Sequence, residues 1–361
     1  MNTLIKKTLQ LAAGKRHLRF MEVCGTHTVS IFRSGIRQIL PDNVELVSGP
    51  GCPVCVTNDD YIDKAIAYSQ QKDFIIATFG DMLKVPGSRS SLAAAAAEGA
   101  QIKIVYSPLD CIKLAKENPH KKITFLAVGF ETTAPTAAAT VLAAKAQGIK
   151  NLFMLSAQKL VPPALRFLLN DSAVKVDGFL LPGHVAVIIG ANAFNFLSTE
   201  FKIPSAIGGF EVEEILSALV SLLEQINQNQ AEVSNNYRSV VKAEGNLSAQ
   251  KILAQVYEVT DAEWRGMGKI PASGLKMRDE FAEFDIEQVA PIEIELINKK
   301  TPCRCGEVLR GIVKPTDCPL FGKICTPIHA VGACMVSVEG VCAAWFKYRG
   351  NSFEWEVESE K

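Results

Sequence analysis

The sequence predicts an α/β protein with two Rossmann-like parallel-sheet domains that face a cleft, followed by a third, mixed and mainly helical domain. Three observations support this prediction. Short apolar runs alternate with helical patterns from residue 19 to about 225, as in parallel βαβ units. These runs are rich in Val, Ile and Phe on both faces, as strands buried under helices are. Polar and reactive residues follow the runs, where parallel α/β folds bind ligands.

Eight strands are expected, each followed by a helical or loop segment. They are Arg19–Val23, Val44–Val47, Phe74–Phe79, Ile102–Tyr106, Ile123–Val128, Leu152–Leu155, Gly178–Leu181 and Ser205–Ile207, with helices expected at Asp60–Gln70, Ser91–Glu98 and Pro135–Gln147. Eight such units can form one closed barrel or two open sheets. A barrel of eight usually needs about 250 residues, and these units occupy only about 205, so two open sheets are favoured.

The polar segment Lys116–Lys122 is the expected linker between the two sheets. We therefore expect an N-terminal helix in residues 1–18 that packs on the third domain, α/β domains at 19–118 and 119–210, and an iron–sulfur domain at 211–361. The third domain is expected to begin with a long helix after residue 210, and its cysteines are considered below.

Composition excludes several classes of protein. Thirty-eight basic and 38 acidic residues balance, so no basic stripe indicates nucleic acid. No apolar run approaches the roughly 18 residues that a membrane span needs, and the start of the chain is typical of an amphipathic helix, not of a signal peptide. We expect a cytoplasmic protein, and in that reducing compartment closely spaced cysteines favour metal or redox chemistry over structural disulfides.

Candidate site residues follow five of the expected strands. They are Cys24 and His27 in CGTH, Cys52 and Cys55 in GPGCPVC, Asp81 in TFGD, Glu131 in GFETT and His184 in PGH. If the two halves face each other, these side chains line one cleft. Simpler interpretations remain: His184 as a turn histidine, Glu131 at a helix N-terminus and Asp81 as a loop cap.

The first two motifs place thiols where a strand passes into a helix. A helix N-terminus and the nearby imidazolium of His27 favour the thiolate of Cys24, which would suit iron or an electrophile; the alternative is an inert buried cysteine. Cys52 and Cys55 form a C-x-x-C that is either a redox-active dithiol or half of a metal site. With Cys24 they make three thiols, which favours an open site with an exchangeable partner.

Six of the ten cysteines lie in the last sixty residues: Cys303, Cys305, Cys318, Cys325, Cys334 and Cys342. Four thiolates can hold an iron–sulfur cluster or zinc. The spacing lacks the paired C-x2-C of a zinc ribbon, and the intervening prolines and glycines suit a loop around a cluster. Zinc and structural thiols are the alternatives.

Together these motifs resemble the HypD family of hydrogenase maturation factors. The resemblance covers nearly the whole chain through MEVCGTH, GPGCPVC, TFGDMLKVPGS, IVYSPLD, VGFETTAPT, PGHV, NLSAQ, EWRGMG, CGEVLRG, CPLFG and MVSVEGVCAAW. It implies a [4Fe-4S] protein that assembles the Fe(CN)2CO group of [NiFe]-hydrogenases with a small HypC-like chaperone and a HypE-like cyanide donor. One departure is Val212, where a proline often follows the glutamate in the family.

The resemblance also implies roles for the cysteines. Cys24 would bind the iron together with a cysteine of the chaperone, and Cys52 and Cys55 would act in iron handling or thiol redox chemistry. The cluster ligands would be Cys305, Cys318, Cys325 and Cys342, with Cys303 and Cys334 as alternates. His27 or His184, if protonated, would supply protons.

Three other functions make different predictions. A dinucleotide-dependent oxidoreductase predicts G-x-G-x-x-G after a strand, and neither half contains it. A pure scaffold predicts a cluster that only stabilises the third domain. A disulfide isomerase predicts an exposed C-x-x-C in a thioredoxin-like unit, whereas this motif follows GPG within a many-stranded body.

Overall fold

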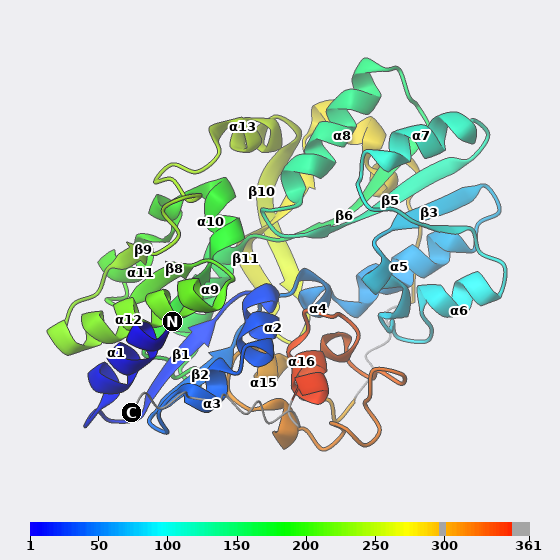
Figure 1. The fold of residues 1–361 in the computed structure, drawn as a ribbon. Coiled ribbons are helices and arrows are strands. Elements are labelled where there is room, and N and C mark those ends of the chain that lie inside the picture. Colours follow the sequence, from blue (N-terminus) through cyan, green and yellow to red (C-terminus); the bar gives the residue numbers. More distant parts are fainter. Residues whose placement is uncertain (296–300, 349–361) are drawn as a thin grey trace.

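Two open parallel sheets form the body of the protein in the computed structural model, which describes residues 1–295 and 301–348 (Figure 1). The first sheet has the order β2 (Val44–Ser48), β1 (Leu18–Glu22), β7 (Gly178–Pro182), β8 (Ser205–Gly208) and β9 (Val233–Asn235). The second has the order β4 (Ile102–Ile104), β3 (Phe74–Thr78), β5 (Lys122–Gly129) and β6 (Leu152–Gln158). All eight expected strands and the choice of open sheets over a barrel are confirmed, and β9 is an addition.

The sheets do not divide the chain at the expected linker. Phe74 and Ile76 of β3 pair in parallel with Lys122 and Thr124 of β5, across residues 116–122. The first sheet therefore takes two strands from the start of the chain and three from after residue 177, and the second sheet takes the four strands between them. The two sheets therefore do not correspond to the expected domains 19–118 and 119–210, because each sheet pairs strands from both of these ranges.

Helices cover both sheets and connect their strands. Their bounds are α2 (Gly25–Arg33), α3 (Ile36–Ile39), α4 (Pro53–Val56), α5 (Asp59–Ser69), α6 (Leu92–Ala97), α7 (Asp110–Glu117), α8 (Ala134–Ala146), α9 (Val161–Asn170), α10 (Gly183–Ile189), α11 (Phe196–Thr199), α13 (Leu247–Val256) and α14 (Ile286–Val289), with 3-10 turns η1 (Gly80–Lys84), η2 (Ala191–Phe194) and η3 (Asp279–Phe284). The three helices expected within the α/β region correspond to α5, α6 and α8.

The N-terminal helix and the long helix after residue 210 belong with the first sheet. The long helix, α12 (Val212–Gln228), packs on β7 and β8 and begins with a capping box between Glu211 and Glu214. The N-terminal helix, α1 (Asn2–Ala12), packs on α12. Both elements were expected with the third domain, but their apolar faces are buried against this sheet.

A hairpin that the sequence did not predict lies between the two sheets (Figure 1). It consists of β10 (Tyr257–Trp264) and β11 (Gly268–Met277), which are antiparallel. The amide of Leu160, after β6, donates to the carbonyl of Ser273 at 2.9 Å. Trp264 at the tip stacks on Phe130, with ring centroids 5.9 Å apart. The hairpin thus joins the second sheet to the region around α4.

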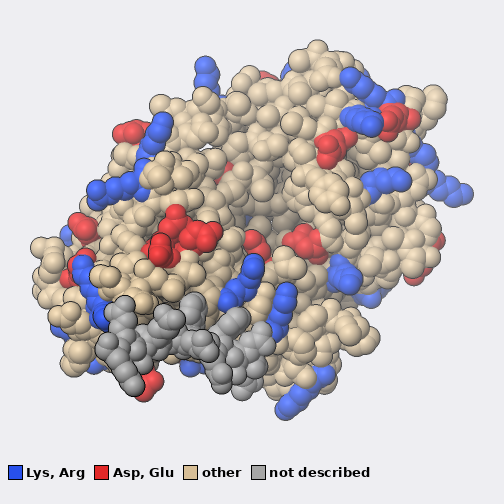
Figure 2. All heavy atoms as spheres, in the orientation of Figure 1, with Lys and Arg blue, Asp and Glu red and all other residues tan. Residues whose placement is uncertain are grey.

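The cysteine-rich segment completes the described structure with short helices only. These are α15 (Cys305–Leu309), η4 (Pro315–Asp317), η5 (Ala333–Met335) and α16 (Val341–Tyr348). On the face shown in Figure 2, basic and acidic side chains are interspersed. Within the described residues, no helix combines the length and the apolar character that crossing a bilayer requires.

Candidate functional site

Cys24 and His184 meet at the carboxyl end of the first sheet. Cys24 follows β1 and His184 follows β7, two neighbouring strands from which the chain continues to opposite sides of the sheet. This arrangement makes a topological switch point, where α/β folds bind ligands. The Cys24 Sγ lies 3.5 Å from the His184 Nε2, and Cys24 is only 1% exposed. The structure therefore brings together two of the predicted site residues.

His27 lies beside them, one turn into α2. Its Nε2 donates a hydrogen bond to the carbonyl of Gly209 at 2.7 Å, while Nδ1 has no partner among the described residues. Phe210 stacks against both imidazoles, with its ring centroid 4.8 Å from that of His27 and 5.0 Å from that of His184. One aromatic ring after β8 therefore fixes both histidines, a role that the sequence did not indicate.

Burial reverses the ionisation that was expected for this site. It raises the pKa of Cys24 to about 12, and nearby Glu339 and Glu22 add to this effect. Burial also lowers the pKa of both His27 and His184 to about 4. The expected thiolate and imidazolium are therefore corrected to a thiol and two neutral imidazoles, because desolvation outweighs the helix N-terminus. A bound metal cation would displace the thiol proton.

Glu22, the last residue of β1, contacts the Cys24 backbone and was not predicted as a site residue. Its Oε1 accepts a hydrogen bond from Thr28 Oγ1 at 2.6 Å and its Oε2 accepts one from the amide of Cys24 at 3.3 Å. Burial raises its pKa to about 7. A carboxyl group at the buried end of a mostly apolar strand was the available signal.

The GPG turn after β2 packs directly on the backbone of Cys24. The amide of Gly25 donates to the carbonyl of Gly51 at 3.0 Å, and a Cβ at position 51 would lie 2.2 Å from the Cys24 nitrogen. Only glycine fits there. The turn leads into Cys52, whose Sγ accepts a hydrogen bond from the amide of Cys55 at 3.3 Å. The two front motifs are thus neighbours in space.

Asp81 and Glu131 follow β3 and β5, the strands at the switch point of the second sheet. Asp81 accepts a hydrogen bond from Ser337 Oγ at 3.4 Å. Glu131 accepts one from the amide of Val161 at 2.8 Å, which places it at the N-terminus of α9, and burial raises its pKa to about 7. Asp81 therefore contacts the cysteine-rich segment, whereas Glu131 contacts the first amide of α9 and not the helix that follows it in sequence, α8.

Five tail cysteines surround one cavity. They are Cys303, Cys305, Cys318, Cys325 and Cys342, and the remaining wall includes Val308, Phe321 and Met335. The Sγ atoms of Cys303 and Cys305 are 3.1 Å apart. Several thiols on an apolar wall are the donor set that an iron–sulfur cluster requires. The cavity volume is about 10 Å³, room for about one water, so a cluster would need the thiols to move outward.

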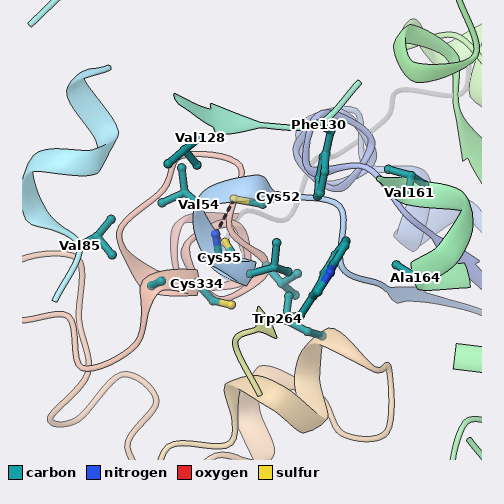
Figure 3. Close-up of a cluster of buried hydrophobic side chains, with 14 of the residues drawn as sticks. Cys52, Val54, Cys55, Val85, Val128, Phe130, Val161, Ala164, Trp264 and Cys334 are labelled. Atoms are coloured by element: carbon teal, nitrogen blue, oxygen red, sulfur yellow. Dashed lines mark hydrogen bonds between the residues drawn. The ribbon is translucent and has the colours of Figure 1, made fainter. Parts of the chain in front are cut away.

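The sixth tail cysteine, Cys334, connects this cavity to the front pair. It is fully buried and lies near Cys55 in the cluster of buried side chains drawn in Figure 3. Cys305 of the tail cavity is a neighbour on its other side. Burial, followed by the neighbouring thiols of Cys334 and Cys52, raises the pKa of Cys55. Among the residues described, no three histidine, cysteine or carboxylate side chains are placed to hold a single metal ion. A cluster separates its ligands more widely than one ion does, because its own atoms occupy the centre.

Comparison with known proteins gives one consistent result. The HypD family, described as the hydrogenase formation hypA family, matches residues 1–349. The chain is 45% identical over 341 residues to the hydrogenase maturation factor HypD of Escherichia coli K12, covering 94% of this chain and 91% of that protein. It is 42% identical over 341 residues to the HypD of Azotobacter vinelandii, covering 92% and 90%.

Proposed function

Because the chain belongs to the HypD family and so acts in hydrogenase formation, we propose that it holds the iron that receives CN and CO in [NiFe]-hydrogenase assembly. The observation that carries this proposal is the Cys24–His184 pair, with Sγ and Nε2 3.5 Å apart at a switch point. A sulfur and a neutral imidazole nitrogen are both ligands that suit iron. Iron is here the substrate, delivered and then passed on.

Cys24 would bind this iron as a thiolate, shared with a cysteine of a HypC-like chaperone. Thiolates donate electron density, which suits iron that carries the strong-field ligands CN and CO. Binding requires loss of the Cys24 proton, and the neutral imidazole of His184 offers an acceptor or a further ligand. Glu22 and Gly51 fix the Cys24 backbone through the contacts described above.

A groove beside Cys24 supports a protein partner. It has a volume of about 640 Å³ between α2 and α16, and its lining includes Thr26, Val338, Glu339 and Phe346. Val338 is 78% exposed and Phe346 is 42% exposed. An apolar groove next to a buried metal-binding thiol suits a chaperone that delivers a second ligand. A HypE-like protein would supply cyanide to the same region.

A resident [4Fe-4S] cluster is proposed for the tail cavity. Cys305, Cys318, Cys325 and Cys342 would hold it, and Cys303 and Cys334 are the alternates. When bound, such a cluster supplies electrons one at a time. The convergence of five thiols on one apolar cavity supports this assignment.

Cys52 and Cys55 would act as a dithiol, or alternatively as further iron ligands. Oxidation of the dithiol to a disulfide forms one S–S bond and releases two electrons and two protons. Cleavage of the S–C bond of a thiocyanate-like donor consumes two electrons and yields a thiolate and cyanide, which the two protons neutralise. The pair therefore balances cyanide release in atoms and electrons.

The Cys24→Ala variant tests the iron site. With the HypC-like partner present, we expect loss of the infrared bands of iron-bound CN and CO, together with loss of one iron per complex. Cys111→Ala is the matched control, because Cys111 is also fully buried but lies in the separate core around α7 and α8. Unchanged bands in Cys24→Ala would refute the assignment.

Two alternatives make distinct predictions for the cluster. A purely structural cluster is favoured by the nearly closed cavity, and it predicts that Cys318→Ala destabilises the tail without changing the midpoint potential of the Cys52–Cys55 pair. A redox-active oxidoreductase predicts turnover without any partner protein. Redox titration of the pair with and without the cluster separates electron supply from a structural role.

A further inference from the structure

The tip of the β10–β11 hairpin lies between the two groups of cysteines, and the proposed iron chemistry gives it no role. The tip is the turn at residues 265–267. Gly266 packs on Gly306, the second residue of α15, so closely that a Cβ at position 266 would lie 2.4 Å from the Gly306 Cα. On the other side, the amide of Arg265 donates to the carbonyl of Val56, the last residue of α4, at 2.9 Å. The turn therefore contacts both the helix of the front cysteine pair and the helix that begins at the tail cavity.

The side chain of Arg265 ties three segments together beside α4. Its Nε donates to the carbonyl of Thr57 at 2.7 Å, and its Nη2 donates to Asp59 Oδ1 at 2.6 Å and to the carbonyl of Pro86 at 3.4 Å. These acceptors belong to the end of α4, the first turn of α5 and the loop after η1. The side chain is only 13% exposed, so the protein and not the solvent fixes where its charge lies.

The positive charge of this guanidinium reaches the thiols of the tail cavity. A hydrogen bond with Cys305 and burial raise the pKa of Cys303, and Arg265 opposes that rise. Arg265 also opposes the raised pKa of Cys305, which depends mainly on the thiols of Cys303 and Cys334. A cation that favours a thiolate also favours other negative charge placed in the same cavity, because both effects are Coulombic.

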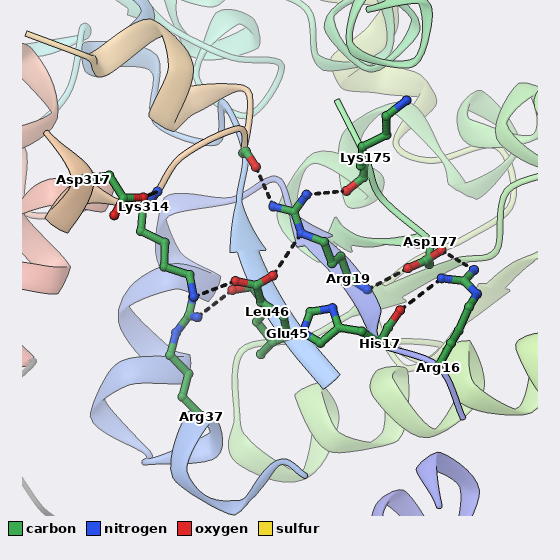
Figure 4. A network of polar contacts seen from close by, with 11 residues as sticks. Arg16, His17, Arg19, Arg37, Glu45, Leu46, Lys175, Asp177, Lys314 and Asp317 are labelled. Atoms are coloured by element: carbon green, nitrogen blue, oxygen red, sulfur yellow. Dashed lines mark hydrogen bonds and ion pairs between the residues drawn. The ribbon is translucent and has the colours of Figure 1, made fainter. Parts of the chain in front are cut away.

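Three cations within residues 303–317 are more exposed than Arg265. Their side chains are 26–54% exposed, and each forms an ion pair with a carboxylate. The pairs are Arg304 with Glu307, Arg310 with Asp171, and Lys314 with Glu45 (Figure 4). Water and salt screen exposed charges more than buried ones. Arg265, whose partner Asp59 is itself more exposed than the guanidinium, is therefore the cation best placed to act on the tail cavity.

We propose that Arg265 tunes the reduction potential of the tail site, where its positive charge favours the uptake of an electron. The inference rests on the cluster proposed for this cavity. Cluster potentials depend on the charge and the solvent exposure around the sulfurs, and reduction adds one negative charge that a shielded cation stabilises. Because the same side chain holds the end of α4, Arg265 acts as a positioning residue for the front pair as well.

The test is an anaerobic redox titration of the reconstituted full-length chain, followed by electron paramagnetic resonance. Arg265→Met should lower the equilibrium constant for reduction threefold to tenfold, a negative shift of roughly 30–60 mV at 59 mV per factor of ten. Arg265→Lys keeps the charge and should stay close to the wild type. Arg278→Met removes an arginine that pairs with Glu258 at the other end of the hairpin, and this matched control should leave the potential unchanged. An unchanged potential in Arg265→Met, or equal shifts in the Met and Lys variants, would overturn the proposal.

Asp59→Asn gives a prediction of the opposite sign. It removes the carboxylate that offsets Arg265 but keeps an oxygen that can accept its hydrogen bond, so the potential should become more positive. Loss of packing alone does not predict opposite shifts in the two variants. This variant decides the matter should Arg265→Met fail to fold, and a zero or negative shift then counts against the proposal. A wild-type chain that binds no cluster overturns this inference together with the cluster assignment, whereas a cluster whose potential ignores both substitutions overturns this inference alone.

Discussion

Access to Cys24 is controlled by a covering segment, residues 336–340, that lies across the start of α2. Glu339 Oε1 accepts a hydrogen bond from Thr26 Oγ1 at 2.7 Å, and a Cβ at Gly25 would lie 2.6 Å from the Glu339 Cβ. Ser337 holds the same segment to Asp81 of the second sheet. Because Cys24 is 1% exposed, we expect its thiol to react with an external reagent only when this segment opens.

The Glu339→Ala variant should favour the open state. A hydrogen bond to a charged group contributes about 1.5–3 kcal/mol, and the lower end applies to this partly exposed contact, so opening should increase roughly tenfold at ~1.4 kcal/mol per factor of ten. The assay is a timed pulse of N-ethylmaleimide followed by mass spectrometry of the Cys24 peptide. When closing is fast, the labelling rate follows the population of the open form.

The Glu339→Gln variant separates the hydrogen bond from the charge. It removes the negative charge that helps to raise the pKa of Cys24 but retains an acceptor for Thr26. We expect its labelling to increase less than that of Glu339→Ala. Cys111, buried elsewhere, is the internal control in every sample. Equal labelling of the two variants, or a parallel increase at Cys111, would refute the role of this contact.

Two further predictions concern the tail cavity and a buried carboxyl. Gly332→Ala should lower the iron bound after anaerobic reconstitution severalfold, because a Cβ there would lie 2.4 Å from the Cys305 Sγ. Gly80→Ala is the control and should keep its iron, because its Cβ would lie 3.8 Å from the nearest atom. Equal iron contents in the two variants would contradict a cluster in this cavity. Burial raises the pKa of Glu131 to about 7, so the folded state binds its proton more tightly than the unfolded state does. This protonation adds up to about 3 kcal/mol to the free energy of unfolding; the gain is complete below about pH 4.5 and is lost as the pH rises through 7. Urea unfolding of Glu131→Gln at pH 5 and pH 8 should therefore show less loss with pH than the wild type, and identical pH dependence would contradict this.

The strands and their ends were predictable because buried parallel strands are continuous apolar runs followed by turn and site residues. Sheet membership was not, because the pairing of Phe74 with Lys122 joins segments that no local pattern connects. The hairpin was missed because neither strand is a continuous apolar run: most of β10 is exposed or only partly buried, and β11 buries residues at irregular intervals. The three-residue turn at 265–267 also carries no two-residue hairpin signal.

The positions of the candidate residues in the fold were predictable, but their charges were not. Each of Cys24, His27 and His184 lies at the end of the first sheet as expected. Their ionisation depends on how deeply the whole fold buries them, which the CGTH and PGH motifs do not encode. The helix N-terminus that favours a thiolate is a local feature, and desolvation is a global one that outweighs it here.

The two groups of cysteines, almost 300 residues apart in sequence, lie next to each other in the structure. The short helix α4 packs on η5, so Cys55 meets Cys334, and Cys334 in turn meets Cys305 at the tail cavity. If the proposed cluster occupies this cavity, Cys334 is the thiol that lies between it and the front pair. Cys334 was only an alternate in the ligand set that the family resemblance implies, yet its replacement should distinguish a redox path from a structural cluster most directly.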